Sequence, residues 1–335
     1  MTSWAGIRLP VPRGRLAVTD PTHVHLLLNH VPTVGFVIGV LLFVSSWIAR
    51  NAELKRASLL VLVGVALVTI PAYVSGNAAE EVLCAGGGKT PACADPSVSK
   101  SLIETHEGAA LLAFAAIVLT GAFAWLGLWQ IRRTSRAESW NLAVILLLSL
   151  VAFGLVARAA NIGGEIRHPE IRPAQETVTP EGHLARRLGS FVLALPYGWP
   201  SLETLHFIGL SLLIGVILLI DLRMLGVMKN VAFPALHRLL PWAILGFGTN
   251  LVTGMLFFVA SPDQYDRNIA FIWKMILVML AGANALYFTL FDEAWVLKPG
   301  DDAPFTAKVV AVSAIALWLG VLYFGSMLPF LGNSF

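Results

Sequence analysis

Charged residues are scarce in this sequence of 335 residues: Asp, Glu, Lys and Arg together make up 13%, whereas hydrophobic residues make up 57%. A typical soluble domain carries roughly 25% charged residues. The formal net charge is only +3, and the sequence has no basic stripe with interleaved aromatics, no phosphate-binding loop and no zinc-finger spacing. We therefore expect no nucleic-acid partner, and the composition indicates an integral membrane protein surrounded by lipid.

Cysteine is also scarce, because Cys84 and Cys93 are the only two. Neither belongs to a C-x-x-C-H motif, which excludes covalently attached c-type haem. Residues 1–20 lack the apolar core of a signal peptide, so no cleavable leader is expected. Both cysteines fall in the loop 77–102, and we predict a disulfide there, as is typical of an oxidising compartment. Two unpaired thiols in a loop are the alternative.

Long apolar runs dominate the rest of the chain and show no strand-like alternation. Runs of this length predict membrane-spanning helices. The expected spans are residues 26–49, 57–76, 103–130, 140–160, 202–222, 237–260, 269–291 and 305–329. A polar stretch over 161–201 separates them into two groups of four. The sequence therefore predicts an all-α polytopic membrane protein with eight transmembrane helices in two four-helix bundles. We assign 1–22 to an N-terminal tail, 23–165 to the first domain, 166–200 to a link and 201–335 to the second domain.

Lysine and arginine gather in one set of short loops, which predicts that this side faces the cytoplasm. The residues concerned are Arg50, Lys55, Arg56, Arg132, Arg133, Arg136, Arg223, Lys229 and Arg238. Both termini, the 77–102 loop and the link would then be extracytoplasmic. We expect a multi-pass protein of the bacterial inner membrane.

Three histidines crowd the start of the first apolar run, at His23, His25 and His30. Ionisable groups at membrane depth are costly, so they indicate a functional site. His23 and His30, seven residues apart, share a helix face, whereas His25 lies on another face. Pro32 removes a helical hydrogen bond and predicts a kink or a helix start, which leaves the rotation of these histidines open.

Another histidine, His106, lies near the start of the third apolar run, on the same side of the membrane as His25 and His30. In an up-down bundle, the first and third helices start on one side and can lie diagonally across the core. His30, or alternatively His25, could then face His106 across a haem b and supply the second axial ligand. Arg158, near the end of the fourth run, could pair with a haem propionate.

The second half has a similar arrangement, with one basic residue in its first run and one in its third run. Its first run carries His206 and its third run carries Lys274, both near the same side as the histidines of the first half. We read this as a parallel internal repeat and predict that His206 and Lys274 approach each other in one polar pocket. His206 is a further candidate metal ligand.

The first half resembles an uncharacterised group of bacterial four-helix membrane proteins over about residues 22–168. The segments that carry the resemblance are His25-Leu-Leu-Leu-Asn-His30-Val-Pro, Pro71-Ala-Tyr-Val-Ser-Gly76-Asn-Ala-Ala-Glu80-Glu81, Glu104-Thr-His106-Glu107 and Asn161-Ile-Gly163-Gly164-Glu165. The resemblance implies a fold and a haem site but no activity.

The second half, over about residues 200–330, is similar in outline to the CopD-type and HemJ-type four-helix membrane families. In HemJ-type protoporphyrinogen oxidases a first-helix histidine and a third-helix lysine are functionally important, and His206 and Lys274 are the matching positions. Asp221-Leu-Arg223-Met-Leu-Gly226 and Thr253-Gly254 also look like an uncharacterised bacterial family.

These observations predict a b-type cytochrome-like membrane subunit that passes electrons between a quinone or external carrier and a partner protein of a redox complex. The expected cofactor is haem b, with quinone as a further candidate. The alternatives are a HemJ-like membrane oxidoreductase, a CopD-like protein that handles copper through His23, His25 and His30, and a cofactor-free anchor subunit. Whether the chain is itself an enzyme stays open.

Overall fold

The computed structural model describes residues 20–84, 93, 98–172, 178–266, 268–291 and 296–331, and in this part the protein is mostly helical and contains no β-strand. Eight of these helices are long and apolar enough to cross a membrane. The predicted all-α polytopic membrane fold with eight spans is therefore confirmed. Most of the N-terminal tail, residues 1–19, lies outside the described residues.

The first span combines α1 (Pro21–Leu28), a π-helical turn η2 (Val31–Gly35) and α2 (Phe36–Ile48). Asp20 begins it, because its carboxylate accepts the backbone N–H of Thr22 at 2.9 Å. Pro32 has no N–H to continue the α-helical ladder, and the π-turn forms at this proline. The kink predicted at Pro32 is thus an extra-wide turn inside one continuous span.

The remaining spans of the first half are α3 (Ala52–Cys84), α4 (Lys100–Thr134) and α5 (Ser139–Arg167). The first span packs on α3 and, through η2 and α2, on α5, while α4 packs on both α3 and α5. The first span and α4 therefore lie diagonally across this bundle. Its core is built from residues such as Phe36, Phe43, Leu59 and Ile145, none of which is exposed.

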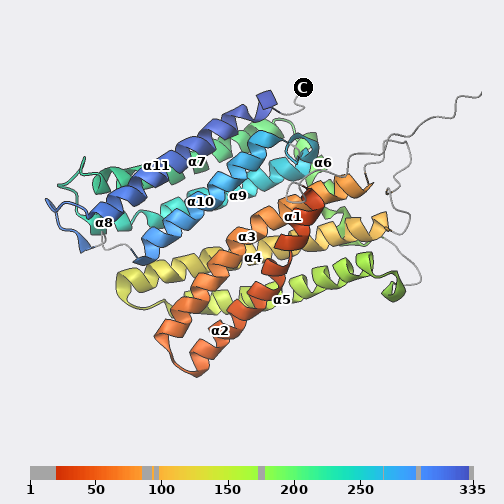
Figure 1. Cartoon of the computed structure of the whole chain (residues 1–335), viewed down its shortest axis with the longest axis horizontal. Helices are drawn as coiled ribbons and strands as arrows, with labels where there is room; N and C mark the ends of the chain where they lie inside the picture. The colour runs from red at the N-terminus through yellow and green to blue at the C-terminus, as the bar shows by residue number, and fades with distance from the viewer. Residues whose placement is uncertain are drawn as a thin grey trace, which may run out of the picture.

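The second half contains α7 (Gly198–Met224), α8 (Phe233–His237) with α9 (Leu240–Ala260), α10 (Ile269–Phe291) and α11 (Phe305–Leu331). Here α7 packs on α9 and α11, and α10 packs on α11. Figure 1 shows the two halves as two layers of roughly parallel helices, with α7–α11 above α1–α5. The first span begins and the last span ends at one end of the molecule, which we call the histidine end because His25, His106 and His206 lie there.

The two layers contact each other mainly through α10, which packs against α3 and α4. Arg56 of α3 donates to the carbonyl of Leu290 at 2.8 Å, and Trp129 of α4 donates its indole N–H to the carbonyl of His237 at 3.1 Å. Both bonds lie at the end opposite the histidine end. His237 of α8 thus packs beside Trp129.

The link between the halves contains a helix that the sequence analysis did not anticipate, α6 (Leu184–Ala194). It follows η3 (Pro169–Ile171) and η4 (Pro180–His183) and packs on α9 and α4 at the histidine end. Its buried face consists of Ala185, Gly189 and Val192, spaced as on one side of a helix. Gly189 permits the closest approach, because a Cβ there would lie 2.6 Å from the carbonyl oxygen of Val259. Through α6 the link also joins the two layers.

The two cysteines are bonded to each other, as the sequence predicts: Cys84, the last residue of α3, forms a disulfide with Cys93. The bond ties the chain beyond α3 to the histidine end. The compartment in which it forms stays a prediction.

Candidate functional site

His25 is the histidine of the first span that turns into the bundle. Its Nδ1 lies 3.0 Å from the carbonyl oxygen of Ala72 in α3. A carbonyl can only accept, so Nδ1 carries the proton and Nε2 keeps its lone pair. The ring lies against Gly76, where a Cβ would come within 3.0 Å of Cε1. The glycine therefore provides the space that the imidazole occupies.

His106 repeats this arrangement on the opposite side of the bundle. Its Nδ1 donates to the carbonyl oxygen of Ala159 in α5 at 2.9 Å, which again leaves the lone pair on Nε2. The ring lies against Gly163, where a Cβ would sit 3.2 Å from Cε1. Thus α3 and α5 orient the imidazoles that the first span and α4 supply.

A positive charge on His25 would be felt at His106, so the two rings lie in one region of the bundle. His30 does not take part, because its side chain is exposed and its Nδ1 contacts the carbonyl of Leu26 on its own helix at 3.1 Å. His23 is exposed as well. Of the two partners that the sequence leaves open for His106, the structure therefore brings His25 into place and not His30.

Arg158 lies on α5 near this site but already has a protein partner. Its guanidinium forms an ion pair with Glu181 of η4. A hydrogen bond from its own backbone N–H lowers the pKa of Glu181, and the contact with the Arg158 guanidinium lowers it further. A role of Arg158 towards a propionate stays a prediction, and it would require Arg158 to share or exchange this partner.

In the second half, His206 of α7 is oriented by α9. Its Nδ1 donates to the hydroxyl oxygen of Thr253 at 2.8 Å, and that hydroxyl donates in turn to the carbonyl of Thr249 at 2.8 Å. Nε2 is again the nitrogen with the lone pair. The ring contacts Gly254, at 3.9 Å from a Cβ placed there.

Lys274 of α10 faces the same interior. It interacts electrostatically with His206, and its Nζ would lie 3.8 Å from a Cβ on Gly325 of α11. Both residues line one cavity of about 800 Å³ between α7, α9, α10 and α11. The sequence predicts their approach, but the cavity is mainly apolar. Its polar lining is limited to a few side chains, which include Glu203, His206, Asn250, Gln264, Tyr265 and Lys274.

Tyr265 closes part of this cavity from the turn between α9 and α10. Its ring packs edge-on against Phe271, 5.3 Å between centroids, and also contacts Phe258. Burial, together with the negative charge of Glu203, raises the pKa of Tyr265 to about 12. The phenol is therefore neutral at physiological pH and can donate a hydrogen bond into the cavity.

The two halves follow one plan at the histidine end. In each half a histidine of the first span lies against a glycine of the second span, Gly76 or Gly254. In each half a basic residue of the third span lies against a glycine of the fourth span: His106 against Gly163, and Lys274 against Gly325. This correspondence supports the internal repeat expected from the sequence. The third-span residue differs, so the two sites differ in chemistry.

The sequence analysis assigned roles to the basic residues, whereas Gly76, Gly163, Thr253 and Gly254 appeared there only within segments that resemble other families. Thr253 and the four glycines carry no charge, and many glycines occur in these helices, so spacing alone does not mark them. The pairing of each glycine with one basic side chain becomes visible only when the two halves are superimposed. Comparison with known protein families, curated proteins and solved structures gave no match for this chain.

Proposed function

We propose that the protein is a b-type cytochrome-like membrane subunit, with His25 and His106 as the axial ligands of one haem b. The observation that carries this proposal is the matched pair of imidazoles. Each comes from a diagonal helix, each is fixed through Nδ1 by a backbone carbonyl, and each keeps Nε2 for a ligand. Imidazole oriented by a hydrogen bond from its other nitrogen is the usual form of a metal-binding histidine.

Two glycines make room for the two imidazole rings. Gly76 and Gly163 leave the space in which the imidazoles lie, and a side chain at either position would displace a ring. Gly108 of α4 serves a different contact, because the backbone of Glu181 in η4 packs directly against it. The bound haem would supply one-electron chemistry, and the protein would supply a low-dielectric interior that tunes its potential.

The His206–Lys274 cavity gives the second component of the proposal. Its volume of about 800 Å³ is in the range of small-molecule sites, and its apolar walls with few polar groups suit a planar, largely hydrophobic redox molecule of the quinone class. Lys274 and the Tyr265 phenol can donate to a carbonyl or carboxylate oxygen, and Nε2 of His206 can accept a proton. Electrons would then pass between this molecule and the haem, with a partner protein as the other carrier.

A HemJ-like oxidoreductase is the second candidate, and the shared cavity of His206 and Lys274 is the observation that favours it. A tetrapyrrole substrate would occupy the same cavity. The copper-handling alternative receives no such support, because His23 and His30 are exposed while His25 turns away to Ala72.

The proposal is tested by purifying the full-length protein in detergent and measuring its haem as the pyridine haemochrome, together with its reversible reduction. We expect b-type haem with a low-spin spectrum. In His106→Ala the haem should be lost or become high spin, whereas His23→Ala should match the unmutated protein. An unmutated protein that purifies without haem after growth with a haem precursor would refute the proposal.

A further inference from the structure

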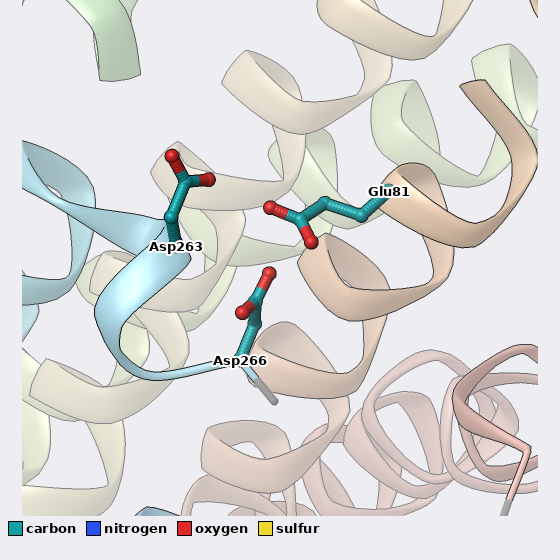
Figure 2. A group of neighbouring side chains, drawn as sticks. All are labelled: Glu81, Asp263 and Asp266. Atoms are coloured by element: carbon teal, nitrogen blue, oxygen red, sulfur yellow. The ribbon is translucent and has the colours of Figure 1, made fainter. Parts of the chain in front are cut away.

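Three carboxylates converge at the histidine end, where Glu81, Asp263 and Asp266 have oxygens within 4.8 Å of one another (Figure 2). Glu81 lies in the last turn of α3, Asp263 in η5 (Pro262–Gln264), and Asp266 in the turn between η5 and α10. The cluster therefore joins the two layers, and it lies outside the sites described above.

Asp266 is the member of this cluster that most requires a ligand. Only 6% of the residue is exposed, and neither of its carboxylate oxygens has a hydrogen-bond partner among the described residues. Figure 2 shows its carboxylate pointing towards that of Glu81, with Asp263 facing the same space. An ionised carboxylate that is buried without donors is strongly unfavourable unless a cation neutralises it.

The backbone holds Asp266 in this orientation. Its N–H donates to the carbonyl of Pro262 at 3.1 Å. The side chain of Asn268 fixes the other end of the turn by donating to the carbonyls of Gln264, at 3.2 Å, and Leu328, at 3.0 Å. The buried carboxylate is thus directed at Glu81 by a hydrogen-bonded turn.

We propose that Glu81, Asp263 and Asp266 bind a hard divalent cation of the Ca²⁺ class. Ca²⁺ prefers carboxylate and water oxygens, and its irregular coordination tolerates ligands from separate segments. Mg²⁺ demands near-ideal octahedral geometry, which favours Ca²⁺ for a site assembled from two layers. Asp263 is exposed, so water can complete the coordination. A bound cation would neutralise the carboxyl groups that crowd together here and would be attracted by each of them.

The proposed ion would also act on the cavity of the second half. Gln264 and Tyr265 lie between the two aspartates in the chain, and both line the His206–Lys274 cavity. Fixing Asp263 and Asp266 to Glu81 would therefore fix this wall of the cavity relative to α3. The site itself does not depend on the proposed haem.

The test is calorimetric titration of the full-length protein, freed of metal in detergent, with CaCl₂ and separately with MgCl₂. Thermal unfolding is followed under the same conditions. We expect saturable Ca²⁺ binding, tighter than Mg²⁺, and an unfolding midpoint that rises with Ca²⁺. Asp266→Asn should weaken Ca²⁺ binding by at least about tenfold, as loss of contacts around a metal typically does. The matched control is Glu53→Gln, which removes an exposed carboxylate at the other end of α3.

Asp266→Asn keeps the shape of the side chain and removes one repelling charge, so without Ca²⁺ it should unfold no earlier than the unmutated protein. Glu81→Gln provides a second variant from the other layer and should weaken binding likewise. The proposal is overturned if the unmutated protein binds no Ca²⁺. It is also overturned if both variants bind as tightly as Glu53→Gln, or if Mg²⁺ binds more tightly than Ca²⁺. Absence of binding would indicate that the three carboxyls share protons instead.

Discussion

Lys274 distinguishes the second site from the first at the scale of single residues. It occupies the place that His106 takes in the first half, but it offers a flexible Nζ hydrogen-bond donor instead of an imidazole, the usual ligand type for haem iron. Neighbouring His206 keeps its Nε2 lone pair, so the pair offers a donor and an acceptor side by side. The expected ligand is consequently an organic molecule with oxygen acceptors.

Lys274→Met should weaken binding of a water-soluble quinone analogue by about fivefold, because a hydrogen bond typically contributes roughly 1 kcal/mol. Binding can be followed through quenching of tryptophan fluorescence, since Trp199 and Trp318 line the cavity. Lys298→Met, an exposed lysine at the opposite end, is the control. Equal affinity in the two variants would remove Lys274 from the site.

The sequence analysis predicted the charged and histidine residues of both sites but not which histidine of the first span would face inward. His25 and His30 both precede the π-turn, and its extra residue changes how α1 is rotated relative to α2. That change depends on how Pro32 is accommodated, which helical periodicity alone does not determine.

At the scale of elements, α7 and α9 touch through a pair of glycines. A Cβ on Gly246 would lie 2.6 Å from the carbonyl oxygen of Gly209, and a Cβ on Gly209 would lie 3.0 Å from that of Gly246. Both neighbours are backbone atoms, so neither can move without separating the helices. This contact sets the distance between His206 and the hydroxyl of Thr253 that orients it.

Gly246→Ala should therefore destabilise the protein by about 1–3 kcal/mol, the usual cost of overpacking. Gly248 lies on the same helix, and a Cβ there would have no neighbour within 4 Å. Thermal unfolding in detergent should show a lower midpoint for Gly246→Ala and an unchanged or higher one for Gly248→Ala. Similar midpoints for the two variants would contradict this packing.

The spans were predictable because each is a long apolar run, whereas α6 was not. Its sequence, Leu-Ala-Arg-Arg-Leu-Gly-Ser-Phe-Val-Leu-Ala, is too short for a span and carries Arg186 and Arg187, so it reads as part of a polar link. Its helical form depends on packing against α9 and α4, which the local sequence does not reveal.

At the scale of the whole molecule, eight antiparallel spans place Arg133 and Lys229 at the end opposite the histidine end. The distribution of positive charge predicts that this end faces the cytoplasm. Single cysteines introduced at Arg133 and at Lys229, with Cys84 and Cys93 retained as their disulfide, should be labelled by an impermeant thiol reagent only after the membrane is opened. Labelling of either site in intact cells would reverse the orientation.

The acidic cluster also belongs to this scale, and it was not predictable. Glu81 and the two aspartates are far apart in the sequence, and each alone reads as an ordinary loop or helix-end carboxylate. Only the packing of α3 beside the turn between α9 and α10 brings them together (Figure 2). The internal repeat, by contrast, was a hypothesis that the positions of His206 and Lys274 in the sequence suggested.

The most direct test of the account is a comparison of His25→Ala with His30→Ala in the purified protein, using haem content and the low-spin optical spectrum. The two histidines are five residues apart on the first span, but only His25 turns into the bundle, whereas His30 is exposed and contacts its own helix. We predict that His25→Ala loses haem or becomes high spin, as His106→Ala does, while His30→Ala keeps the full low-spin spectrum. A low-spin spectrum that survives in His25→Ala and disappears in His30→Ala would contradict the assignment.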